Sequence, residues 1–115
     1  MQQLQISATF PCVTPQAADE FDRLVAEALV TIRDEDGTLQ HDWFFSQDGR
    51  ECHVREMYVS SEAFLAHLAG AGPLLGRLVE LGGGLELDVF GEPSDAVLAA
   101  IADFRPCIHS FSQGK

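Results

Sequence analysis

The chain has 115 residues, and its 18 acidic against 7 basic side chains give a formal net charge of −11. This length fits a single domain over residues 1–115, and 46% hydrophobic against 22% charged residues is typical of a folded globular protein. So acidic a chain repels phosphate groups, which excludes nucleic acid and anionic membranes as expected partners. No apolar run approaches the roughly 20 residues that a membrane span requires.

The cysteines and the N-terminus bear on the compartment. The three cysteines, Cys12, Cys52 and Cys107, lie far apart and form no C-x-x-C pair, as is typical of reduced thiols in the cytosol. The first ten residues have neither a basic segment nor an apolar run, so they do not resemble a secretory signal. We therefore expect a cytoplasmic protein.

The chain begins with a strand followed by a helix. Residues 3–10 alternate apolar and polar side chains, which is the period of a half-buried strand. Thr14 and Pro15 then provide a helix N-cap and a first helical position. Apolar residues recur every three or four positions up to Ile32 and form one stripe, so this helix is expected to pack on a sheet or on another helix.

An aromatic hairpin follows an acidic turn. Residues 38–47 read as a strand with apolar side chains on both faces, and such strands are usually covered on both sides. The Asp-Gly dipeptide at 48–49 predicts a tight turn, and residues 50–59 return as the partner strand. One face of the first strand carries Leu39, His41, Trp43 and Phe45.

The second half of the chain predicts helices separated by one strand. Ser60 or Ser61 caps a helix that we expect to be interrupted at residues 70–73, followed by a short helix over 74–81. Residues 85–91 alternate as a strand, and a last amphipathic helix follows Pro93-Ser94-Asp95. Residues 107–111 read either as a fifth short strand or as a tail that crosses to a partner subunit.

This order of elements predicts a ferredoxin-like α+β domain of the split βαβ type, with helices on one face of the sheet. The other face would expose apolar side chains, for which the candidates are Trp43 or Phe44, Phe45 and Val54. A second copy packed sheet against sheet would cover them, so we expect a homodimer. A pocket is expected between the sheet and the helices.

Candidate site residues gather where the second hairpin strand meets its helix. Glu56 and Tyr58 are two residues apart and leave the same face of the strand, and His67 follows on the helix. No pair of histidines has metal-ligand spacing, and neither H-E-x-x-H nor C-x-x-C occurs, so no metal site is expected.

Short motifs continue along most of the chain: Gly37-Thr38-Leu39, Trp43-Phe44, Asp48-Gly49, Glu56-x-Tyr58, Ser61-x-Ala63 with His67, Leu85-Glu86 and Gly91-x-Pro93-Ser94. Together they resemble the antibiotic biosynthesis monooxygenase family, especially its small quinol monooxygenases. The resemblance implies a dimeric α+β barrel. It also implies that some members oxidise quinols or polyphenols with dioxygen, using no metal, haem or flavin cofactor. Relatives often carry a tyrosine two residues after the Gly-Thr-Leu triplet, where this chain has His41.

The expected activity is therefore cofactor-independent oxidation of a quinol or a polycyclic aromatic substrate. Such chemistry needs a base that makes an electron-rich phenolate and an apolar pocket that holds a flat ring. His67 is the first candidate for the base, and Glu56 would orient it or share its proton. For contact with the substrate the candidates are Trp43, Phe44 or Phe45, which would stack on the ring, Tyr58, which would hydrogen-bond it, and His41.

Each candidate also has a structural reading, and the function has alternatives. His67 would cap its helix or bond a strand carbonyl, Glu56 would form a buried pair, and Tyr58 would be a core residue. The same scaffold also serves non-catalytic modules that bind a small hydrophobic molecule, and a related branch degrades haem.

Overall fold

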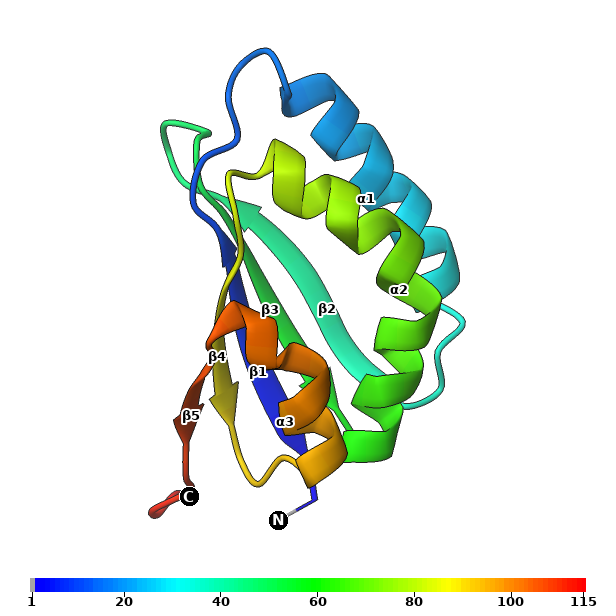
Figure 1. Ribbon diagram of the computed structural model, residues 1–115, viewed down its shortest axis with the longest axis vertical. Coiled ribbons are helices and arrows are strands. Elements are labelled where there is room, and N and C mark those ends of the chain that lie inside the picture. The colour runs from blue at the N-terminus through cyan, green and yellow to red at the C-terminus, as the bar shows by residue number, and fades with distance from the viewer. Residues whose placement is uncertain (1) are drawn as a thin grey trace.

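The computed structural model describes residues 2–115, in which a five-stranded sheet carries its helices on one face (Figure 1). The elements are β1 Leu4–Phe10, α1 Ala18–Ile32, β2 Thr38–Phe45, β3 Cys52–Tyr58, α2 Ser61–Leu81, β4 Glu86–Phe90, α3 Asp95–Ile101, the 3-10 helix η1 Ala102–Phe104 and β5 Cys107–His109. The strand order is β2-β3-β1-β4-β5, with β5 parallel to β4 and every other pair antiparallel. The predicted ferredoxin-like α+β fold is confirmed. The last segment forms a fifth strand of the same sheet, beside β4.

One hydrophobic core lies between the sheet and the helices. The inward residues of β1 alternate with polar ones, and Leu4 and Phe10 are 0% and 2% exposed. They pack with buried side chains from every helix: Phe21 and Leu24 of α1, Phe64 and Leu78 of α2, and Val97 and Ile101 of α3. Burial of each such side chain contributes about 1.5–3 kcal/mol, so the core fixes the helices on this face.

The predicted break in the second helix is wrong, because α2 runs unbroken through Pro73. Figure 1 shows that the helix bends along its length instead of ending. Proline removes one backbone hydrogen bond and crowds the preceding turn, at a cost of about 3 kcal/mol. Leu68 and Leu74 on either side of the bend both pack against the core, and their burial offsets much of that cost.

Gly82, directly after α2, is required by a close approach of β1. A Cβ at Gly82 would lie 2.6 Å from Cδ1 of the buried Phe10 ring. We therefore expect Gly82→Ala to lower the free energy of unfolding by about 1–3 kcal/mol in urea titrations. Gly76→Ala is the control, because a Cβ there meets nothing within 4 Å and should stabilise α2 by up to about 1 kcal/mol. Equal effects of the two substitutions would refute this explanation.

The prediction of an apolar outer sheet face is wrong for three of its residues, among them Phe45, which pairs with the buried Cys52 and packs on Phe21 of α1. Trp43 and Val54 are register partners that face the helices, and Val54 is 1% exposed. Phe44 does lie on the outer face, opposite His53, and is 53% exposed. Most other side chains of that face are polar, among them Gln5, Ser7, Thr9, Asp42, Arg55, Glu86 and Asp88. The sequence showed the alternation of β2 but did not reveal which face met the helices.

Within residues 2–115, no helix combines the length and the apolar character needed to cross a bilayer.

Candidate functional site

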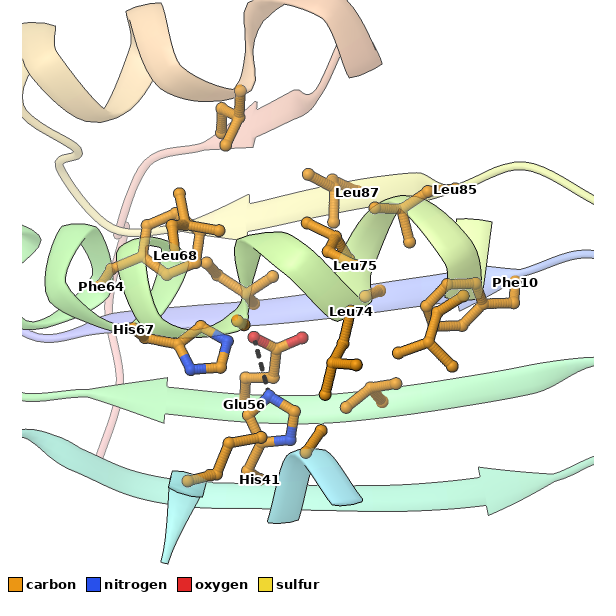
Figure 2. Close-up of a pocket in the computed structure, with 18 of the residues that line it drawn as sticks. Phe10, His41, Glu56, Phe64, His67, Leu68, Leu74, Leu75, Leu85 and Leu87 are labelled. Carbon is orange, nitrogen blue, oxygen red and sulfur yellow. Dashed lines mark ion pairs between the residues drawn. The ribbon is translucent and has the colours of Figure 1, made fainter. Parts of the chain in front are cut away.

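An apolar cavity of about 60 Å³ lies between the sheet and α2. Most of its lining is aliphatic, including Ile6, Leu68, Leu74, Leu75, Leu78 and Leu87. Figure 2 shows that its polar groups gather at one end, around Glu56, while Phe10 and Leu85 lie at the other end. The volume is several times what one water requires, so the cavity has room for a small organic group.

A more polar groove of about 410 Å³ adjoins this cavity at the open edge of β2. Ile32, His41 and Trp43 line both hollows, so these side chains lie between them. The groove is otherwise bordered by Arg33 at the end of α1 and by β2 residues such as Gln40. It is the natural approach from solvent to the polar end of the cavity.

Three side chains from different elements meet at that polar end. His41 comes from β2, Glu56 from β3 and His67 from α2, and one nitrogen or oxygen of each lies within 4.8 Å of the others. In the register of the hairpin His41 pairs with Glu56, which places the two side chains together on the helix side of the sheet. Figure 2 shows the two imidazoles on either side of the carboxyl group.

His67 is held from behind by Glu35, a residue of the turn between α1 and β2. The Nδ1 atom of His67 lies 2.9 Å from Oε1 of Glu35, and the hydroxyl of Thr38 donates to the same oxygen at 2.8 Å. A carboxylate only accepts, so Nδ1 carries the hydrogen and a neutral His67 keeps its lone pair on Nε2. His67 is 6% exposed and lines the cavity, so this unprotonated nitrogen belongs to an apolar, water-poor site.

Glu56 is a carboxyl group with little contact with water. Its side chain is 9% exposed, and burial raises its pKa from 4.5 to about 7. Oε1 accepts from the hydroxyl of Tyr58 at 2.5 Å and lies 3.5 Å from Nε2 of His41. Burial and the neighbouring Glu56 raise the pKa of Tyr58, which keeps its hydroxyl protonated. Because these contacts all involve Oε1, the proton of a neutral Glu56 belongs on Oε2.

His41 is the neutral member of the cluster. Burial is the main cause that lowers its pKa from 6.5 to about 3, with the neighbouring His67 adding to the effect. The indole N–H of Trp43 donates to Nδ1 of His41 at 3.0 Å. The hydrogen of the neutral ring is therefore on Nε2, which faces Glu56.

Two histidines and one carboxylate also form a donor set of the kind that binds a divalent metal. His67 has the tautomer expected of a metal ligand, because its Nδ1–H donates to the Glu35 carboxylate and leaves the lone pair on Nε2. His41 has the opposite form, because Trp43 occupies Nδ1 and leaves the hydrogen on the nitrogen that would bind the ion. The donor set therefore fits proton transfer better than metal ligation.

The structure brings together most of the residues predicted from sequence. His41, Trp43, Glu56 and His67 line the cavity, and Tyr58 is buried beside it against Glu56. Phe45 does not line the cavity; it is 44% exposed and packs edge-on against Phe21.

The sequence did not reveal which residue orients His67. Glu35, not Glu56, is hydrogen-bonded to His67. In the sequence Glu35 belongs to the acidic turn Asp34-Glu35-Asp36, which reads as a solvated loop. Glu35 is less exposed than Asp34 and Asp36 because α1 packs against α2, and no short-range motif encodes that packing.

One family model matches the chain, and solved structures share its fold. A family model described as antibiotic biosynthesis monooxygenase matches residues 6–72. MupZ from Pseudomonas fluorescens superposes with a TM-score of 0.84 at 20% identity, covering 100% of this chain and 94% of its own. SnoaB from Streptomyces nogalater, a cofactor-independent oxygenase, gives 0.67 at 18% identity, covering 82% and 97%. Rv0793 from Mycobacterium tuberculosis gives 0.70 at 24%, covering 82% and 98%. No curated protein matches the chain in sequence.

Proposed function

The chain belongs to the antibiotic biosynthesis monooxygenase family, and on that premise we propose that it oxidises an electron-rich hydroxyarene with dioxygen and without a cofactor. The observation that carries the proposal is the free Nε2 of His67 on the wall of an apolar cavity. A base in such a site can make a phenolate that water does not stabilise, and an unsolvated phenolate gives an electron to dioxygen more readily.

The proposed reaction balances without an external reductant. His67 removes the phenolic proton, and the phenolate passes one electron to dioxygen. The radical pair then forms a bond between a ring carbon and oxygen, giving a peroxide. His67 returns its proton to the outer peroxide oxygen and then takes the proton from that ring carbon. Loss of this second proton breaks the O–O bond, so one oxygen becomes a quinone carbonyl and the other leaves as hydroxide. The substrate supplies all four electrons, and the products are a quinone and water.

Glu56 is the group that protonates the departing oxygen in this scheme. It lies beside His67 and its raised pKa, about 7, keeps much of it neutral near neutral pH. Protonation of hydroxide by Glu56 gives water, and the proton held by His67 then restores Glu56. One site thus contains a base with a free nitrogen and an acid that burial keeps protonated.

The dimensions of the cavity favour a small substrate. A volume of about 60 Å³ is smaller than the roughly 150 Å³ of a cavity that holds benzene, so even one ring would extend partly into the adjoining groove, and a polycyclic substrate or a haem fits less well. The Trp43 ring stacks on the Phe10 ring, with 5.9 Å between the ring centroids, and forms an aromatic wall of the cavity beside His41. Substituents of the ring would extend into the groove along β2.

Dioxygen consumption tests the proposal. Metal-free protein is mixed with monocyclic and bicyclic hydroxyarenes in an oxygen electrode, and we expect uptake above the background of autoxidation with a monocyclic member. Catalase is added as a control, because simple oxidation to hydrogen peroxide returns half of the dioxygen whereas monooxygenation returns none. Saturable binding of the same compounds with no uptake would contradict the proposal and favour a non-catalytic binding module.

We also propose that the protein is a homodimer formed through the outer face of the sheet. Support comes from large apolar side chains on and beside that face, including Phe44 at 53% and Phe90 at 41% exposed. Light scattering during dilution should give twice the mass of 12.5 kDa. Phe44→Asp should lower the mass to that of one chain, whereas a wild-type mass of one chain at all concentrations would refute the dimer.

A further inference from the structure

We infer that the turn between α1 and β2 positions the base: Glu35 fixes the tautomer of His67 and so keeps a lone pair directed into the cavity. Glu35 is a positioning residue, since its hydrogen bond reaches His67 on the side away from the free Nε2. The catalytic consequence rests on the proposed function, but the tautomer itself does not.

The turn approaches α2 closely because it contains a glycine. A Cβ at Gly37 would lie 2.5 Å from the Cβ of Ala63 in the first turn of α2, which is closer than two carbon atoms can pack. The carbonyl of Gly37 also accepts from the backbone N–H of Val59 at 2.9 Å, which ties the turn to the chain just before α2. The Gly37–Ala63 contact therefore sets the distance between Glu35 and His67.

The carboxyl group of Glu35 is held in place through one of its oxygens. Oε1 accepts from Thr38 at 2.8 Å as well as from His67. The position of Gly70 on α2 lies beside Oε2, where a Cβ would be 3.6 Å away. With the Glu35 side chain only 18% exposed, water competes weakly for these bonds.

The tautomer decides whether His67 can act as a base. A neutral imidazole carries one hydrogen, and the group that accepts from one nitrogen determines which nitrogen keeps the lone pair. Without an acceptor at Nδ1, the hydrogen can move to Nε2, and the nitrogen in the cavity then becomes a donor. Asp34 and Asp36 flank Glu35 in the same turn but make no side-chain hydrogen bond within residues 2–115.

The test uses Glu35→Leu, which leaves no acceptor at Nδ1; glutamine is unsuitable because its amide oxygen can still accept from Nδ1. Nitrogen-15 NMR of labelled histidine reports the tautomer directly, with the His67 signals assigned from a His67→Ala sample. We expect wild-type protein to show a hydrogen on Nδ1 and Glu35→Leu to show it largely on Nε2. The control Asp36→Asn, an exposed neighbour in the same turn, should keep the wild-type pattern.

Turnover should follow the tautomer. In Glu35→Leu we expect kcat to fall by roughly 10²–10⁴-fold with little change in KM, because the base is lost while the cavity is preserved. Gly37→Ala, which moves the turn without altering Glu35, should show signals of both tautomers and a smaller loss of kcat.

An unchanged His67 tautomer in Glu35→Leu would overturn the inference. The two proposals can fail separately. Wild-type protein that shows the expected tautomer switch but consumes no dioxygen would support the positioning role and contradict the proposed oxidation.

Discussion

Replacing His67 with alanine is expected to lower turnover of a hydroxyarene by roughly 10²–10⁴-fold, the usual contribution of a general base. His67 is the only cavity residue with an unprotonated nitrogen that no described hydrogen bond occupies, because the free acceptor of His41 is taken by Trp43. Substrate binding should weaken far less, since most of the cavity wall is aliphatic. The measurement is kcat and KM from initial rates of dioxygen uptake.

The matched control for this substitution is His109→Ala. His109 lies on β5, bonds Asp88 at 2.9 Å and does not line the cavity, so its loss should leave kcat within a factor of two or so. Both variants should melt cooperatively. Full activity in a folded His67→Ala protein would remove His67 from the mechanism and with it the main support for the proposed function.

Glu56→Gln is expected to change how stability depends on pH. Burial raises the pKa of Glu56 from 4.5 to about 7, so between these pH values the folded protein holds a proton that the unfolded chain has released. Stability from this group is therefore present below pH 4.5 and lost as the pH rises towards 7. At about 1.4 kcal/mol for each pKa unit, the loss is about 3 kcal/mol in wild type and zero in the variant.

The measurement is urea unfolding of both proteins at pH 4.5 and pH 8. Relative to wild type, Glu56→Gln should gain about 3 kcal/mol between these two conditions. His41 has the opposite dependence, because its pKa is lowered to about 3 and its contribution rises from pH 3 to 6.5. That contribution is common to both proteins and cancels in the difference. Parallel curves of stability against pH for wild type and Glu56→Gln would show that Glu56 is ionised in the fold. Glu86→Gln, at an exposed position, is the control, and its curve should run parallel to that of wild type.

The fold was largely predictable because it follows from local patterns. Alternation fixed β1 and β4, the apolar stripe ending at Ile32 fixed α1, and the Asp-Gly turn fixed the hairpin. The break predicted at Pro73 failed, because packing of neighbouring leucines overrides the local preference of proline.

The candidate site was predictable only where it depends on strand spacing. Glu56 and Tyr58 share a face by alternation, whereas the pairing of His41 with Glu56 could not be fixed from the sequence and is given by the hairpin register of the structure. The bond from Glu35 to His67 spans 32 residues of sequence and depends on how closely the turn at Gly37 approaches α2. A contact of this kind is set by tertiary packing, so a single sequence does not reveal it.

The most direct test of the central claim is the fate of isotopic oxygen in one turnover. Metal-free protein and a monocyclic hydroxyarene are mixed with ¹⁸O₂, and the quinone is reduced and trapped at once to prevent exchange of its carbonyl oxygen with water. We expect one labelled oxygen atom in the product of wild-type protein, and none above background with His67→Ala. Unlabelled quinone accompanied by hydrogen peroxide, or equal labelling with the two proteins, would contradict it.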